Sequence, residues 1–181
     1  MKFRNKEKIK SILEMNISDN EKRNLIANLR NYKTDIGRII LTDEELNLHE
    51  GQIWDNLQQA TSWTDRNADN VEFRPEGGGK IKYVLYVEGV EGYQVQYLSY
   101  DNIFNELYYE RDLEEEVADR IADEISSDEV YLELMKLLGS DGDMDSEAEV
   151  LVPSDTKLEI VEINDGRDDV GYIEVILREV K

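Results

Sequence analysis

The chain has 181 residues, of which 40% are hydrophobic and 8% aromatic, enough for a folded core and against general disorder. Its net charge of -21 predicts repulsion from nucleic acid and anionic membranes and attraction to basic surfaces. The absence of cysteine excludes disulfides, thiolate metal sites and cysteine nucleophiles. The charged N-terminus has no apolar signal segment and no apolar run is long enough to span a bilayer, so we expect a cytoplasmic protein.

The charge is distributed unevenly. Residues 1–40 carry a net charge of +5, whereas residues 41–181 carry -26. The stretch 101–149 alone contains 18 acidic residues and three basic ones. A difference of this size predicts two modules that have different partners.

The N-terminal module, residues 1–62, is predicted to be helical and basic. Ile9 and Ile12 have helical spacing, and Ser18 begins an S-D-N-E capping box that opens a second helix. Residues 31–38 are interpreted as an irregular link. A second capping box, at Thr42, predicts a third helix over residues 42–57.

The run ISDNEKRNLIANLRNYKTDIGRIILTDEELNLHEGQIWDNLQ resembles the helix-turn-helix domains of small phage proteins and phage-type repressors. Asn28, Leu29 and Asn31 stand where the recognition helix and its trailing turn would be, with Tyr32 in place of the usual glycine. The resemblance implies binding of operator DNA, and the implied phosphate and base contacts are Lys22, Arg23, Arg30 and Lys33. The alternative is a helical bundle with solvated lysines.

The second module, residues 63–181, follows a polar linker at 60–70. Alternating apolar residues predict a three-stranded meander, and Val117, Ile121 and Ile125 share one face of a helix that begins at Asp101. A shorter helix is expected from Ser126 to Gly139. The predicted strands are 71–74, 80–88, 93–98, 147–152, 157–163 and 170–177. The order β-β-β-α-α-β-β-β makes the fold class α+β.

Carboxylates fill the exposed faces of the predicted helix after Asp101, and few lysines lie among them to form pairs along the helix. A folded acidic surface of this kind can occupy a groove that normally binds nucleic acid. The predicted partner-binding residues are Asp112, Glu114, Glu115, Glu116, Asp119 and Asp123. The alternative is a solvated helix face.

No catalytic or metal site is predicted. Asp141, Asp143 and Asp145 have the spacing of a calcium loop, but Ser146 and Val152 replace the glycine and glutamate that such a loop needs. The single histidine, His49, has no identifiable partner. Acidic and lysine residues beside the strands match no nuclease spacing; they are Glu72, Glu76, Lys80, Lys82 and Glu88. The expectation is a protein that is not an enzyme and needs no cofactor.

A basic helix-turn-helix-like head joined to an acidic α+β body resembles phage and mobile-element counter-defence proteins, in particular anti-CRISPR proteins. The resemblance implies an inhibitor that binds a Cas nuclease or its guide complex and blocks nucleic-acid access, inside a bacterial host cell. One alternative is a phage-type transcriptional regulator whose acidic body forms a homodimer. A further alternative is a metal-dependent nuclease.

Overall fold

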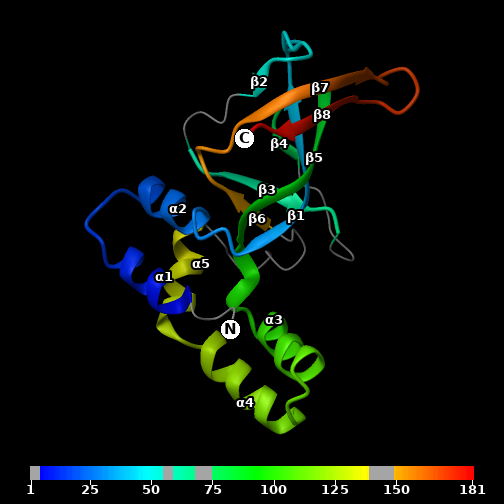
Figure 1. The fold of residues 1–181 in the computed structure, drawn as a ribbon. Coiled ribbons are helices and arrows are strands. Elements are labelled where there is room, and N and C mark those ends of the chain that lie inside the picture. The colour runs from blue at the N-terminus through cyan, green and yellow to red at the C-terminus, as the bar shows by residue number, and fades with distance from the viewer. Residues whose placement is uncertain (1–4, 55–58, 68–74, 139–148) are drawn as a thin grey trace.

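The computed structural model describes residues 5–54, 59–67, 75–138 and 149–181, and it contains one mixed sheet flanked by helices (Figure 1). The helices are α1 (Asn5–Leu13), α2 (Asp19–Ala27), α3 (Tyr100–Asn105), α4 (Glu115–Ser126) and α5 (Glu129–Leu137). The strands are β1 (Tyr32–Thr42), β2 (Ile53–Trp54), β3 (Thr61–Asp65), β4 (Pro75–Gly77), β5 (Ile81–Gln94), β6 (Glu149–Val152), β7 (Leu158–Asp165) and β8 (Ile173–Glu179). The α+β class is therefore confirmed.

Strands β1 and β5 form the centre of the sheet. β1 pairs with β3 and β5, β3 pairs with β6, and β6 pairs with β5, so these four strands close into a small barrel-like ring. β8 joins β5 in parallel, and β7 and β2 extend the sheet beyond it. The buried side chains of this part include Trp63, Tyr83, Leu85, Val150 and Val175, and they form a continuous core.

Strand β5 continues through the point where the sequence predicts a turn. Gly89 has φ of +64°, and the register of β1 against β5 shifts between Thr34 and Ile36 directly opposite. In this bulge Glu88 and Gly89 of β5 together oppose Asp35 of β1, and the Asp35 carboxylate accepts a hydrogen bond from the Gly89 backbone N–H at 2.9 Å. The glycine thus bends one long strand, so the predicted meander is wrong: β5 runs through the predicted turn, and Val95–Leu98 of the predicted strand 93–98 forms a 3₁₀ helix. The predicted strand 71–74 lies outside the described residues.

Helices α1, α2 and α5 pack on one another and on the end of the sheet formed by β5 and β6. Ile9, Ile26 and Leu134 are fully buried there, together with Tyr93 of β5 and Leu151 of β6. The predicted capping box is present, since the Ser18 hydroxyl accepts from the Glu21 N–H and the Glu21 carboxylate accepts from the Ser18 N–H. These helices therefore share a core with the sheet.

Helices α3 and α4 extend from the sheet as an arm, which we define as Tyr100–Ser126 (Figure 1). Between them lies a π-helical segment, Glu106–Glu110, followed by a break in which Asp112 has φ of +52°. The arm has a small core of its own around Ile103, Leu107 and Ala118. No helix among the described residues has the length and apolar character needed to cross a membrane.

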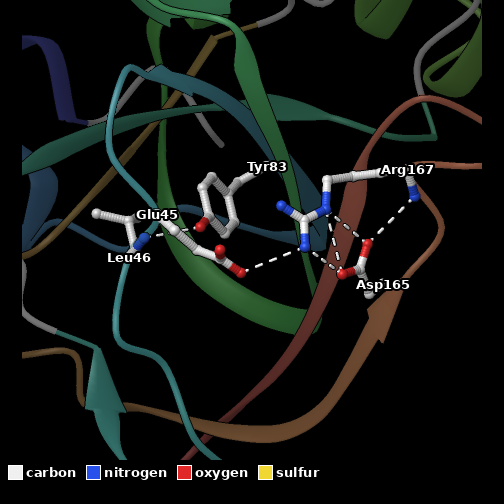
Figure 2. A network of polar contacts seen from close by, with 5 residues as sticks. All are labelled: Glu45, Leu46, Tyr83, Asp165 and Arg167. Carbon is white, nitrogen blue, oxygen red and sulfur yellow. Dashed lines mark hydrogen bonds and ion pairs between the residues drawn. The ribbon is translucent and has the colours of Figure 1, made fainter.

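The predicted third helix over residues 42–57 is wrong, as is the predicted link at 31–38. Residues 32–42 form β1, whose β-branched Ile36, Ile39 and Ile40 pair along β5. The segment after β1 is held by tertiary contacts rather than by helical hydrogen bonds (Figure 2). The Tyr83 hydroxyl accepts from the Leu46 N–H at 2.8 Å, and Arg167 pairs with Glu45 at 3.3 Å.

Arg167 also pairs with Asp165 at 2.5 Å, within the turn between β7 and β8 (Figure 2). Through its pair with Glu45, Arg167 therefore connects the segment after β1 to this turn. The sheet thus contains strands from both sides of the predicted division at residue 62. The division into two domains stays a prediction.

Candidate functional site

A pocket of about 230 Å³ lies where β1, β3, β4 and β6 meet. Four strands that are distant in the sequence contribute its walls. The residues that line it are Gly37, Arg38, Ser62, Trp63, Thr64, Pro75, Glu76 and Glu149. Several of these are polar groups on regular strands, so the backbone of the sheet fixes their relative positions.

The strand register explains why Ser62 and Glu149 meet. Thr64 of β3 is opposite Glu149 of β6, and Ser62, two residues from Thr64, lies on the same face. Neighbouring strands lie about 4.8 Å apart, so the Ser62 hydroxyl reaches the Glu149 carboxylate. Arg38 follows Gly37, which is opposite Thr64, so it lies on the other face of β1 and lines the pocket beside Trp63.

Glu149 is the buried acid of the pocket. Only 8% of its surface is exposed, although it is the first residue of β6. The Ser62 hydroxyl donates a short hydrogen bond to its carboxylate. A buried carboxylate costs free energy unless it is hydrogen-bonded, so Ser62 both stabilises Glu149 and fixes the direction in which its oxygens point.

Arg38 supplies the positive charge of the pocket. Its guanidinium forms an ion pair with Glu76 of β4, and 19% of its side chain is exposed. Its Cζ lies 5.8 Å from the centre of the Trp63 ring, within the range of a cation–π interaction. The Trp63 indole N–H donates to Thr61 at 2.9 Å, so the ring that supports Arg38 is itself held in place.

A buried hydrogen-bonded group next to the pocket holds β1 against β3. The carboxylate of Asp65, which is 2% exposed, accepts from the hydroxyls of Tyr32 at 2.6 Å and Thr34 at 2.7 Å. It also accepts from the Asn67 N–H at 2.9 Å. Burial, and next the bond to Asp65, raises the pKa of Tyr32 to about 12, so this phenol stays a donor at neutral pH.

The pocket therefore combines an oriented carboxylate, a hydroxyl and a guanidinium. A carboxylate in this setting can stabilise positive charge that develops on a substrate, and a guanidinium can bind a phosphate through two parallel hydrogen bonds. Within the described part of the chain no group of three or more histidine or acidic residues has the geometry to hold a metal ion.

The predicted nucleic-acid contacts lie in and directly after α2. Lys22 donates to the Leu13 carbonyl at 2.8 Å, and Arg30 pairs with Asp155 at 2.8 Å. Lys33 is exposed on β1. The chain turns from α2 into β1 without a third helix, and Arg30 at that turn has φ of +46°. DNA binding by these residues stays a prediction.

The predicted partner-binding acids lie at the break in the arm and along α4. All of them are exposed: Asp112, Glu114, Glu115, Glu116, Asp119 and Asp123. Asp119 accepts from the Tyr100 hydroxyl at 2.5 Å. The structure thus brings these carboxylates together on one arm, while their role in binding stays a prediction.

Other residues considered from the sequence do not gather into a site. His49 is exposed in the segment after β1. Of the residues compared with nuclease cores, Glu76 lines the pocket and pairs with Arg38, whereas Lys80, Lys82 and Glu88 do not line it. Glu72 and most of the candidate calcium loop, up to residue 148, lie outside the described residues.

No family model matches the chain, and no curated protein matches it. Among solved structures, it aligns with two crystal structures of the type III effector XopAI from Xanthomonas axonopodis pv. citri. The first has 9% identity and a TM-score of 0.39 over 83% of this chain, and the second has 8% and 0.38 over 87%. The chain spans 45% and 44% of the length of those two structures.

The chain also aligns with the ADP-ribosyltransferase Vis in complex with M6 Inhibitor. The identity is 13% and the TM-score 0.40, over 98% of this chain and 68% of that one. The expectation that the chain is not an enzyme is not supported, since an enzyme is among the structures that align with it. No sequence signal predicts the pocket, because Arg38, Ser62 and Glu149 share no local motif and line one pocket only in the folded sheet.

Proposed function

We propose that the chain is an enzyme that cleaves the N-glycosidic bond of nicotinamide in NAD and transfers the ADP-ribosyl group to an acceptor. The observation that supports this proposal is the buried Glu149 carboxylate, oriented by the Ser62 hydroxyl, in one pocket with the Arg38 guanidinium. The proposal rests on the chemistry of these three groups. The aligned structures are too distant to support it.

Arg38 is suited to the diphosphate of the substrate. Its guanidinium already binds a carboxylate, that of Glu76, and each phosphate of the NAD diphosphate likewise presents two acceptor oxygens that share one negative charge. The Trp63 ring beneath it limits the directions that the guanidinium can take. A donor bound through this contact lies with its diphosphate beside β1 and its ribose toward β6.

Glu149 is suited to the reacting carbon. When the bond between ribose C1′ and the pyridinium nitrogen breaks, its electron pair goes to nitrogen and positive charge develops on the ribose. A fixed carboxylate stabilises that charge, as in glycoside hydrolysis. An acceptor then bonds to C1′ and releases a proton to solvent. Water as acceptor gives ADP-ribose, and a protein side chain gives a modified protein.

The number of carboxylates favours this class of donor over ordinary glycosides. Glycosidases use two carboxyl groups, one of which protonates the leaving oxygen. The lining of this pocket includes two, and Glu76 is already engaged by Arg38. Nicotinamide leaves as a neutral molecule and requires no proton, so one carboxylate at C1′ is sufficient.

The test is release of nicotinamide from NAD by the purified chain, with and without an arginine- or serine-containing acceptor protein. We expect E149Q to lower the rate by about 10²–10³-fold, because the fixed charge at the transition state is lost. R38K keeps the positive charge but loses the bidentate geometry, and it should raise KM.

The matched controls are E159Q and R178K. These residues form an ion pair on β7 and β8, with Arg178 donating to Glu159 at 2.8 Å, and neither lines the pocket. Both variants should retain the rate of the unaltered chain. The proposal is wrong if no nicotinamide is released with any acceptor, or if folded E149Q is as active as the unaltered chain.

As a second proposal, the chain inhibits a Cas nuclease, as the sequence predicts. The exposed carboxylates on α4 favour binding to a basic protein, whatever the activity of the pocket. Inhibition of nuclease cleavage by the purified chain, and its loss when several of these acids are reversed to lysine, is the measurement that tests it.

A further inference from the structure

Aromatic rings line one side of the arm. Tyr100 and Phe104 are stacked with ring centres 5.8 Å apart and planes 11° apart, and Phe104 and Tyr108 follow at 5.5 Å and 18°. Tyr109 meets Tyr108 edge to face at 4.8 Å, and 70% of its surface is exposed. Tyr100, Phe104 and Tyr108 are spaced four residues apart along α3 and the π-helical segment, and they pack as a ladder against the small core of the arm.

Two hollows lie beside this ladder. One, of about 370 Å³, lies between α3 and the start of α4 and is lined by Tyr100, Phe104, Glu115, Glu116 and Asp119. The other, of about 400 Å³, lies at the break of the arm and is lined by Tyr108, Tyr109, Asp112 and Leu113. We call the two hollows together the trough, and its lining combines aromatic rings with carboxylates.

The charge of the trough restricts what can occupy it. Four of its lining residues are acidic, and none of those the structure gives for either hollow is lysine or arginine. Arg111, in the break of the arm, is exposed and forms an ion pair with the buried Glu106, with its Nη2 3.0 Å from Glu106 Oε1. Nucleic acid and a second copy of this chain, with its net charge of -21, are both repelled.

We propose that the trough is a docking surface for an arginine-rich segment of a partner protein. A guanidinium stacks on an aromatic face and forms paired hydrogen bonds with a carboxylate, and the trough offers both within one side-chain length. Arginine is favoured over lysine because its planar group is more weakly hydrated and fits between ring and acid. The proposal does not depend on the activity of the pocket between β1 and β6.

The test is titration of the full chain with three peptides of equal length, oligo-arginine, oligo-lysine and oligo-glutamate, at physiological salt. We expect oligo-arginine to bind most tightly and oligo-glutamate not at all. The variant E115Q/E116Q/D119N should weaken oligo-arginine binding by about tenfold, as expected for three exposed charge pairs. Asn at 119 still accepts from Tyr100, so the arm should stay folded.

The control E44Q/E50Q/D168N removes the same net charge with the same residue types outside the trough, and these three residues are exposed. It should change binding by less than about twofold, since exposed charges at a distance are screened. Y109L removes an exposed ring and should weaken oligo-arginine more than oligo-lysine. The proposal is overturned by absence of peptide binding, by an equal loss in the control, or by Y109L binding like the unaltered chain.

Discussion

Removal of the Asp65 carboxylate is expected to be among the most destabilising single changes in the barrel-like ring. Asp65 is 2% exposed and accepts from Tyr32, Thr34 and the Asn67 N–H. Hydrogen bonds to a charged group contribute about 1.5–3 kcal/mol each, and donors left unpaired in the interior cost about 1–3 kcal/mol each. The Thr34 hydroxyl retains one contact, with the Asn67 amide at 3.0 Å.

These contributions overlap, because the three donors share one acceptor group. We therefore expect D65A to lower the free energy of unfolding by about 3–5 kcal/mol. D65N keeps an acceptor oxygen in place and should cost about half as much. Y32F removes one donor and leaves Asp65 with two, so its expected cost is about 1–2 kcal/mol.

The assay is urea unfolding at neutral pH, with the midpoint and slope measured separately for D65A, D65N, Y32F and the double variant Y32F/D65A. Because Tyr32 and Asp65 are in contact, the double variant should cost clearly less than the two single variants added together. A free energy of unfolding of D65A within about 0.5 kcal/mol of that of the unaltered chain, or strict additivity, would refute the reasoning.

Two further predictions concern other contacts of the fold. A Cβ at Gly92 would lie 2.6 Å from the Leu151 carbonyl oxygen, which is backbone and cannot rotate away, so G92A should cost about 1–3 kcal/mol in the same unfolding assay; unfolding at the same urea concentration would contradict it. At α5, the hydrogen bond from Lys6 is the main cause that lowers the pKa of Asp128, and the Val130 N–H adds to it. A lowered folded-state pKa stabilises the fold above the ordinary aspartate pKa and loses that stabilisation as pH falls through the folded value. K6Q should therefore show a smaller drop in melting temperature between neutral and acidic pH than the unaltered chain, and an equal drop would contradict it.

Local signals in the sequence predicted some elements well. The capping box at Ser18 set the start of α2, and the apolar spacing of Val117, Ile121 and Ile125 set α4. The same kind of signal at Thr42 did not produce a helix. Ile36, Ile39 and Ile40 pair in β1 against β5, and Thr42 is the last residue of this strand. The residues that follow contact Tyr83 and Arg167. Long-range pairing outweighed a local helix preference that is worth little by itself.

What the sequence by itself determined is the α+β class, the start of α2 and the excess of negative charge between residues 101 and 149, because these depend on residue type and short spacing. The helix expected to begin at Ser126 begins instead after Asp128, whose side chain caps α5. What only the tertiary structure decided is the pocket. Its lining comes from four strands, and the hydrogen bond between Ser62 and Glu149 depends on the register of β3 on β6. Register depends on the packing of the whole sheet, and a shift of one residue would turn each of these side chains to the opposite face.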